Sequence, residues 1–307
     1  MGVVTLIEFY FKLIICITIP EEPKKICLTT LAIGSKYRKH ALQLAEDIHH
    51  YSPDTPFVVL TDNPQIFVGM DSVIPIKHEI QSVGIYHDKL DCIAASFKQG
   101  FNCCIFLDAD CRLLTDITAS RHWQVGLTAK SCHDLKRYVT KNSGQQSSRL
   151  IYELAEKYQF SIEECKFISE WIFVVCRDEQ NNQAEQFLQY WREIRDYMEN
   201  NRVFAGEGEA MGIASNLAGW PVYHYDTGYP NESERHQIFD AYKDRMFYKR
   251  ESIPDHLKET IKKLDKQRLE IEKQSRLSAK INKLKNQCAQ ELRFLRLKIR
   301  YLANLLI

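Results

Sequence analysis

Two acidic residues, Asp108 and Asp110, directly follow the apolar run Cys103–Leu107. An apolar run without alternation is typical of a strand that is buried on both faces of a parallel sheet. Ligands collect at the carboxyl ends of such strands, and two carboxylates spaced i, i+2 can share a hard cation such as Mg²⁺ or Mn²⁺. The pattern therefore predicts a metal site that would grip a diphosphate. Acids after a strand also form turns or cap helices.

The first half of the chain must position this pair, and its pattern alternates between strand and helix. We expect strands at 26–33, 57–60 and 73–76, with amphipathic helices at 34–50 and 86–99 between them. Strands that alternate with helices favour a parallel sheet with right-handed crossovers. The predicted fold class is therefore α/β, with a mostly parallel sheet flanked by helices.

The second half shows a more mixed pattern. It predicts helices at 148–158, 183–200 and 206–219, strands at 123–129, 167–175 and 220–225, and a polar loop at 141–148. Glu170 is the single acid within the strand predicted at 167–175.

Phe106-Leu107-Asp108-Ala109-Asp110 resembles the DXD motif of the GT-A glycosyltransferases, and the family-8-like members resemble it most. The resemblance covers roughly residues 26 to 225. It implies a Rossmann-like GT-A fold and the metal-dependent transfer of a sugar from a nucleoside diphosphate donor, with a UDP-sugar favoured. It also favours retention over inversion at the sugar, and it leaves the acceptor open.

The resemblance assigns metal ligands as well. It implies that Asp110 binds Mn²⁺ or Mg²⁺ directly and that Asp108 reaches both the metal and the ribose. A histidine late in the domain often completes the set, and His224 is the candidate here. The family-8 pattern is His-x-x-Gly before Lys-Pro-Trp, whereas His224 is followed by Tyr-Asp-Thr-Gly and no such lysine. A structural histidine at a strand end is the alternative.

Five further residues occupy positions that the resemblance assigns to donor binding. Thr29, Thr30 and Tyr37 match the region that holds the base, and Tyr37 could stack on uracil. Asp62 would hydrogen-bond the base or cap a turn. Lys89 would contact the donor phosphate or sugar, with a solvated helix lysine as the alternative.

Three glutamates, Glu170, Glu207 and Glu209, are the candidate catalytic residues on the acceptor side. An inverting enzyme needs a carboxylate base for the acceptor hydroxyl, and a retaining enzyme needs polar groups that steady the sugar. We prefer Glu209 over Glu207. Both also fit a simpler role, because acids in the first turn of a helix complement its dipole.

Three other functions remain open. Phosphohydrolases of the haloacid-dehalogenase type also use Asp-x-Asp after an apolar strand, but they favour Thr or Val where this chain has Arg112. A non-catalytic adaptor would present its helical tail to a partner. Nucleotidyl transfer lacks support, because no Gly-rich phosphate loop follows the first strand.

Charge divides the chain into an acidic body and a basic tail. Residues 255–307 contain 14 Lys+Arg and 6 Asp+Glu, a net charge of +8, so the rest carries −7 of the total of +1. An acidic body argues against nucleic-acid binding. The tail lacks Gly and Pro, and its apolar spacing predicts one long helix, either projecting or bent against the body. A membrane surface or a second copy of the chain are its expected partners.

We therefore expect an apolar N-terminal segment at 1–24, a glycosyltransferase-like domain at 25–250 and a basic helical or coiled-coil tail at 255–307. Val3–Ile19 contains Glu8 and Lys12, which disfavours a membrane span and favours packing or interfacial anchoring. Ten scattered cysteines indicate small apolar fillers in a reducing compartment. The expected location is cytoplasmic, either free or peripheral on a membrane.

Overall fold

A computed structural model describes residues 25–113, 123–130, 132–224, 241–242, short helical pieces within 259–273, residues 287–300 and residue 303. The predictions for the N-terminal segment 1–24, and for the part of the domain at 225–240, lie outside these residues. The boundaries of the three predicted regions therefore stay predictions.

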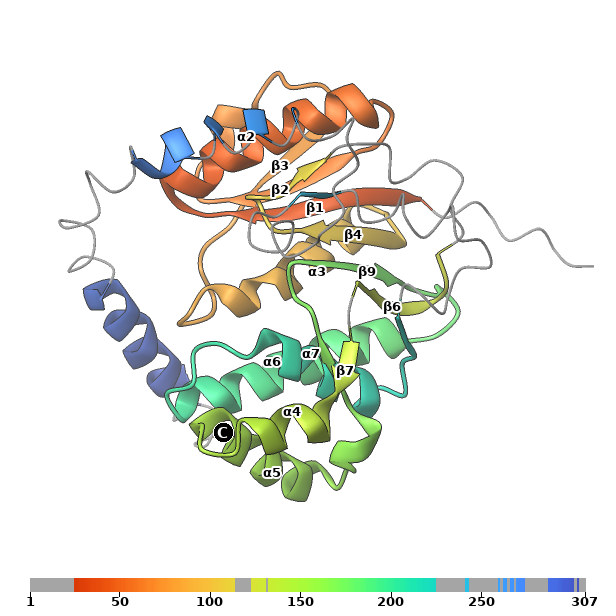
Figure 1. The fold of residues 1–307 in the computed structure, drawn as a ribbon, viewed down its shortest axis with the longest axis vertical. Coiled ribbons are helices and arrows are strands. Elements are labelled where there is room, and N and C mark those ends of the chain that lie inside the picture. Colours follow the sequence, from red (N-terminus) through yellow and green to blue (C-terminus); the bar gives the residue numbers. More distant parts are fainter. Residues whose placement is uncertain are drawn as a thin grey trace, which may run out of the picture.

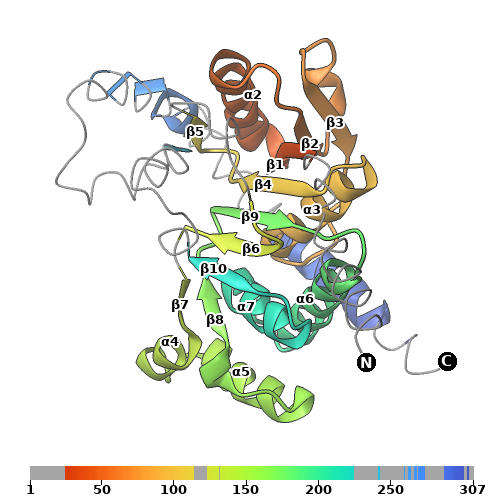
Figure 2. The same cartoon turned by 90° about the vertical axis from the view of Figure 1, so that its right-hand side faces the viewer.

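A seven-stranded mixed sheet forms the centre of the molecule, in the order β10-β6-β9-β4-β1-β2-β3 (Figures 1 and 2). Of its strands, β9 runs antiparallel to β4 and β6, while the other neighbouring pairs are parallel. The predicted α/β class with a mostly parallel, Rossmann-like sheet is confirmed. The strands are β1 (Ile26–Ala32), β2 (Phe57–Thr61), β3 (Val73–Lys77), β4 (Cys103–Leu107), β6 (Gly126–Ala129), β9 (Ile172–Cys176) and β10 (Val222–His224).

Helices cover both faces of the sheet. Helix α2 (Gly34–Tyr51) packs on one face, and α3 (Lys89–Lys98), α6 (Gln183–Asn200) and α7 (Glu207–Leu217) pack on the other (Figure 1). Side chains at successive strand positions point to opposite faces of the sheet. The uninterrupted apolar run of β4 therefore packs into two separate hydrophobic cores, one on each face.

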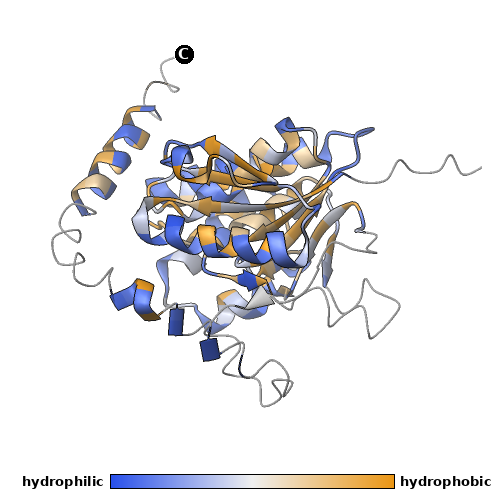
Figure 3. Ribbon diagram, turned by 90° about the horizontal axis from the view of Figure 1, so that it is seen from above, coloured by the Kyte–Doolittle hydropathy of each residue, from blue (hydrophilic) through white to orange (hydrophobic). Residues whose placement is uncertain are grey.

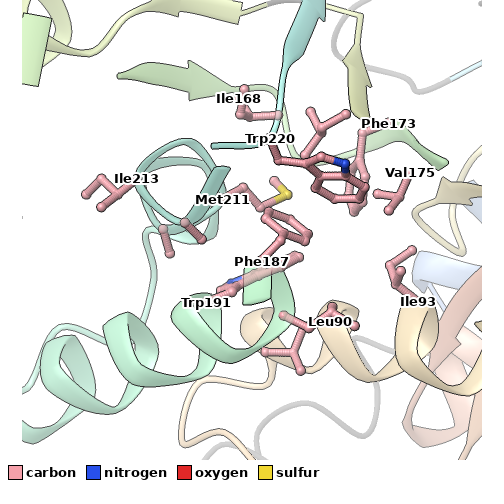
Figure 4. Close-up of a cluster of buried hydrophobic side chains, with 14 of the residues drawn as sticks. Leu90, Ile93, Ile168, Phe173, Val175, Phe187, Trp191, Met211, Ile213 and Trp220 are labelled. Atoms are coloured by element: carbon pink, nitrogen blue, oxygen red, sulfur yellow. The ribbon is translucent and has the colours of Figure 1, made fainter. Parts of the chain in front are cut away.

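The larger core is rich in aromatic residues. Phe187 and Trp191 of α6 meet Phe173 of β9 and Trp220 (Figure 4), and the rings of Phe187 and Trp220 lie 4.9 Å apart. These side chains are almost completely buried. At about 25 cal/mol per Å² of buried apolar surface, such a cluster fixes α6 firmly against the sheet.

Smaller elements complete the fold. They are η1 (Pro64–Phe67), η2 (Tyr86–Asp88), β5 (Arg112–Leu113), β7 (Cys132–Asp134), α4 (Leu135–Lys141), α5 (Gln146–Tyr158), η3 (Ile162–Glu164), β8 (Lys166–Ile168) and β11 (Ala241–Tyr242). Strand β11 pairs with β5, and β7 pairs with β8.

Two predictions for the second half were wrong in detail. The single strand predicted at 167–175 is two strands, β8 and β9, which belong to different sheets, and Glu170 lies in the turn between them. The sequence pattern also missed α4, because its seven residues are too few to show a helical period. Its N-terminal signal was present, since the side chain of Asp134 accepts a hydrogen bond from the backbone N–H of Arg137.

The prediction that Cys103 and Cys176 are free apolar fillers was wrong. The antiparallel register of β4 and β9 places these two residues opposite each other, and they form a disulfide. Their sequence separation of 73 residues gave no sign of this pairing. Cys104 is buried and free, as expected. Disulfides are typical of oxidising compartments, so these cysteines do not support the expected reducing compartment.

The described parts of the tail contact the body at two places. Glu272 lies 3.8 Å from Lys36 of α2, and Gln267 accepts a hydrogen bond from Arg112. The helix at 287–300 contacts the opposite side, near α6 (Figure 1). Both contacts favour a tail that follows the body, whereas the prediction of one unbroken helix depends on 274–286, which are not described. Among the described residues, no helix is long and apolar enough to cross a membrane.

Candidate functional site

The turn after β4 carries the Asp-x-Asp pair to the carboxyl edge of the sheet. The backbone N–H of Cys111 donates to the carbonyl of Asp108 at 2.9 Å, which closes the turn. The N–H of Asp108 donates to the carbonyl of Trp171, also at 2.9 Å. Because β9 runs antiparallel to β4, the turn that precedes β9 lies beside the turn that follows β4. Glu170 reaches the carboxyl edge in this way.

A cavity of about 430 Å³ opens at this edge. Its walls come from the end of β1, the start of α2, the loop before α3, the turns at 108–110 and 170–171, and the start of α7. The residues that line it are Leu31, Ile33, Tyr37, Gly84, Ile85, Tyr86, Lys89, Asp108, Ala109, Asp110, Glu170, Trp171 and Glu207. Six of the eleven site residues expected from the sequence are therefore brought together, which are Tyr37, Lys89, Asp108, Asp110, Glu170 and Glu207.

Lys89 lies at the centre of the acidic wall. Its Nζ is 3.1 Å from Asp108 Oδ1 and 3.2 Å from Glu207 Oε1, and it donates to the backbone carbonyl of Glu170 at 2.9 Å. Burial disfavours the charged amine, but the nearby carboxylates outweigh this effect and raise the pKa of Lys89. Lys89 is thus a permanent cation that joins α3, β4 and α7, and not a solvated helix lysine.

Two glycines place Glu207 in the wall. A Cβ atom on Gly208 would lie 2.4 Å from the carbonyl oxygen of Ile168, and one on Gly212 would lie 1.5 Å from that of Lys166. The four-residue spacing puts both glycines on one face of α7. Only their missing side chains allow α7 to pack this closely on β8, which brings its first residue, Glu207, beside the turn at Glu170.

Negative charge exceeds positive charge at this site. Among the described residues that line the cavity are four carboxylates, Asp108, Asp110, Glu170 and Glu207, and one cation, Lys89. Burial and the neighbouring Glu207 raise the pKa of Glu170. The described cavity wall therefore contains more acidic than basic side chains.

This set of donors fits a hard divalent ion. Mg²⁺ and Mn²⁺ prefer carboxylate oxygens, and Asp108 and Asp110 place theirs at the cavity wall. A cation of charge +2 would offset most of the excess negative charge. The candidate ligands are therefore Asp108 and Asp110, the pair with which the site prediction began.

Glu209 and Tyr138 form a second layer behind this wall. Glu209 is 4% exposed and does not line the cavity. Burial, followed by the repulsion of Glu170 and Glu207, raises its pKa to about 7, although a hydrogen bond with the hydroxyl of Tyr138 opposes the shift. The structure therefore gives Glu207 and Glu170, and not the preferred Glu209, direct access to a bound molecule.

Three residues expected to bind the donor lie outside the cavity wall. Thr29 and Thr30 are completely buried in β1, and the Thr30 hydroxyl donates to the carbonyl of Leu107 at 2.6 Å. Asp62 accepts two hydrogen bonds of 2.6 Å from Arg38 and one from the N–H of Gly34. Burial alone would raise the pKa of Asp62, but these bonds outweigh it and lower the pKa.

His224 ends β10 at the same carboxyl edge. Strands β6 and β9 separate β10 from β4, which corresponds to roughly 14 Å at the usual strand spacing. His224 is half-buried and does not line the cavity. The segment that follows it lies outside the described residues, so its role as third metal ligand stays a prediction.

The sequence pattern missed the loop at 83–86, which supplies Gly84, Ile85 and Tyr86 to the cavity. The buried carboxylate of Glu199 holds this loop by accepting from the N–H groups of Val83 at 2.7 Å and Gly84 at 3.2 Å. Ile85 has φ +74°, and such a conformation is rare for a β-branched residue and recurs at ligand sites. No local pattern in the sequence predicts this loop conformation.

Tyr37 and Tyr86 flank the cavity with rings that are 46% and 54% exposed. Aromatic side chains at a cavity supply flat surfaces for stacking a planar ring. Tyr86 was not foreseen, although an aromatic residue after Gly-Ile at a helix start was a visible signal.

The sequence matches no protein-family model, and no curated protein sequence is significantly similar to it.

Proposed function

We propose that the protein is a metal-dependent glycosyltransferase of the GT-A type that uses a nucleoside diphosphate sugar, with a UDP-sugar favoured. One observation carries the proposal. Asp108 and Asp110, which resemble the DXD motif, line a cavity of about 430 Å³ at the carboxyl edge of a Rossmann-like sheet together with a buried lysine and two further acids. This volume lies in the range of small-molecule sites.

The side chains of the cavity would have separate roles in such a site. When bound, a divalent cation would neutralise the leaving diphosphate as a Lewis acid, and Asp108 and Asp110 would hold it. Tyr37 and Tyr86 offer stacking surfaces for the base. Lys89 keeps Asp108 and Glu207 in place against their mutual repulsion.

Glu170 and Glu207 are the acids that would meet the acceptor. A carboxylate here can accept the proton of an acceptor hydroxyl or hydrogen-bond the sugar. Burial and the neighbouring Glu207 raise the pKa of Glu170, which strengthens Glu170 as a proton acceptor. The resemblance favours retention, in which these groups steady the donor sugar.

The phosphohydrolase alternative finds less support. Arg112 stands where that class favours Thr or Val, and two hydrogen bonds of 2.6 and 2.7 Å direct its guanidinium to Asp47 of α2. An adaptor without a ligand would not need a charged cavity. Neither alternative accounts for the two exposed tyrosines.

Calorimetric titration of the full chain with UDP, with and without Mn²⁺, tests the proposal. We expect micromolar binding that requires Mn²⁺ and that falls at least about 100-fold in Asp110→Ala, the loss expected on removal of a direct ligand. Asp71→Ala is the matched control, because Asp71 is an exposed acid before β3, at the opposite edge of the sheet.

Binding that depends on both Mn²⁺ and Asp110 would justify a screen of UDP-sugars for donor hydrolysis. The proposal fails if neither UDP nor GDP binds in the presence of Mn²⁺, or if Asp110→Ala and Asp71→Ala behave alike.

A further inference from the structure

The helix at 287–300 has two faces of different character. One face packs against the body, while the other carries large apolar side chains in contact with solvent. A helix that is fixed on one side and apolar on the other usually has a second binding partner.

The inner face is fixed by several contacts with the body. Arg293 Nε donates to the carbonyl of Val83 at 3.1 Å, and Lys298 Nζ donates to the carbonyl of Asn200 at 3.0 Å. The rings of Phe294 and Phe204 meet edge to face, with centroids 5.9 Å apart. These contacts fix which face of the helix turns outward.

The outer face carries an apolar stripe made of Leu292, Leu295 and Ile299. These side chains are 59%, 57% and 58% exposed, and their spacing of three and four residues aligns them on one side of the helix. No described residue covers them. Figure 3 shows this helix at the edge of the molecule, with orange and blue segments alternating along it.

Positive charge surrounds the stripe. The helix contains four basic residues and one acid, a net charge of +3, within a tail of net charge +8. Arg296 and Arg300 are both exposed, beside Leu295 and Ile299, and one guanidinium nitrogen of Arg300 donates to Gln81 Oε1 of the body at 3.5 Å, which leaves its other N–H groups for a ligand. Apolar residues next to arginines are typical of helices that lie in the interface of an anionic membrane.

A second copy of the chain fits this face less well. Among the described residues the apolar stripe Leu292, Leu295 and Ile299 spans about one heptad, whereas sustained coiled coils extend over at least about three to four. Pairing two stripes would also bring Arg296 and Arg300 of each copy together, and like charges at such positions repel.

We propose that the outer face of the helix at 287–300 docks the protein onto an anionic lipid bilayer. Leu292, Leu295 and Ile299 insert between the lipids, while Arg296 and Arg300 bind the headgroup phosphates. Because Arg293 of the same helix holds Val83, docking anchors the body beside the loop that lines the cavity. This inference is independent of the reaction in the cavity.

Co-sedimentation of the full chain with vesicles tests the proposal. We expect binding to phosphatidylcholine vesicles that contain phosphatidylserine, little binding to phosphatidylcholine alone, and weakening with added salt. The apolar variant Leu292→Ser/Leu295→Ser/Ile299→Ser and the charge variant Arg296→Glu/Arg300→Glu should each reduce the bound fraction at least about tenfold.

Two matched controls lie on the other described part of the tail. Leu269→Ser removes an apolar side chain that is 47% exposed, and Lys262→Glu/Lys263→Glu reverses two exposed charges. Circular dichroism and thermal melting verify that each variant is folded.

The proposal is overturned if the wild type does not bind the anionic vesicles, which would also be the result if another segment of the chain covers the stripe. It is equally overturned if the two test variants bind like their controls. Sedimentation that shows a dimer dissociated by the apolar variant would instead assign the stripe to a second copy.

Discussion

Two clusters of acidic residues in the described part of the chain lie near the start of α3, and their roles differ. One lines the cavity around Lys89. The other, which we call the rear cluster, consists of His78, Asp88 and Asp91, whose ligand atoms all lie within 4.8 Å of one another. By composition alone, the rear cluster also has the residues of a metal site.

Its hydrogen bonds assign the rear cluster a structural role. Asp88 is completely buried, and it accepts from His78 Nε2 at 2.7 Å and from the N–H groups of Gln81 at 2.8 Å and Ser82 at 2.7 Å. Its oxygens are occupied in shaping the loop. The cavity acids instead outnumber the one lysine among the described residues of the wall. The position of the acids along a cavity wall, and not their clustering, distinguishes the candidate ligand site.

Loss of the cavity's central cation should have the largest effect. In Lys89→Met, Asp108 and Glu207 would keep their charges without a buried partner, which typically costs about 3–5 kcal/mol. We expect this loss in the free energy of unfolding measured with urea. Lys98→Met on the exposed side of the same helix should change it by less than about 0.5 kcal/mol. Equal effects of the two variants would contradict the central role of Lys89.

Substitution of Asp88 in the rear cluster should lower the free energy of unfolding and leave ligand binding unchanged. Asp88→Asn replaces a carboxylate that accepts from two backbone N–H groups, and we expect a loss of about 2–3 kcal/mol. Amide exchange at Gln81 and Ser82 should accelerate, while UDP binding keeps its metal dependence. Asp91→Asn should be neutral or stabilising, because burial and the charge of Asp88 raise the pKa of Asp91. If UDP binding no longer depended on Mn²⁺ in Asp88→Asn, the metal site would have to be assigned to the rear cluster.

The acids behind the cavity should make stability depend on pH. Burial raises the pKa of Glu209 to about 7, against 4.5 when unfolded, so the folded state binds the proton more tightly. The contribution of Glu209 to stability is therefore greatest below pH 4.5 and falls as pH rises toward 7. In Glu209→Gln, the free energy of unfolding should fall less over this pH range than in the wild type, by on the order of 2 kcal/mol. Melting temperatures between pH 5 and pH 8 measure it, and exposed Glu156→Gln should leave the slope unchanged.

The smallest effect should come from the rim of the cavity. Tyr86→Ala removes one stacking surface, and we expect UDP to bind roughly tenfold more weakly, because stacking of a base on an aromatic ring contributes about 1–3 kcal/mol. Stability should not change, since Tyr86 is 54% exposed. Tyr152→Ala on α5, a tyrosine that is 40% exposed and away from the cavity, should bind UDP normally. Unchanged affinity in Tyr86→Ala would place the base elsewhere.

Local sequence was sufficient for the elements that carry most of the site. The apolar run of β4 ends at Leu107 as predicted, because a strand buried on both faces must be apolar throughout and the first carboxylate ends it. The periodic patterns of α2, α6 and α7 likewise predicted these helices to within three residues. Asp108 and Asp110 could be named because they directly follow the end of β4, whereas Lys89 was named through the resemblance and only the structure places it at the start of α3.

The partners of these residues were decided by tertiary structure. Glu170 was predicted inside a strand, but it reaches the cavity because β9 inserts antiparallel beside β4. The same register joins Cys103 to Cys176. Glu199 holds a loop 115 residues earlier in the chain. Strand order and register depend on contacts between distant residues, and no periodicity within a local window contains them.

The amino-acid sequence by itself determined which side chains stand at the ends of the strands and helices, because burial period and helix or strand length are local properties. Only the tertiary structure decided which of those ends meet. Lys89, Asp108, Glu170 and Glu207 come from four separate segments, and their shared position results from the packing of α3, β4, β9 and α7 around one edge of the sheet.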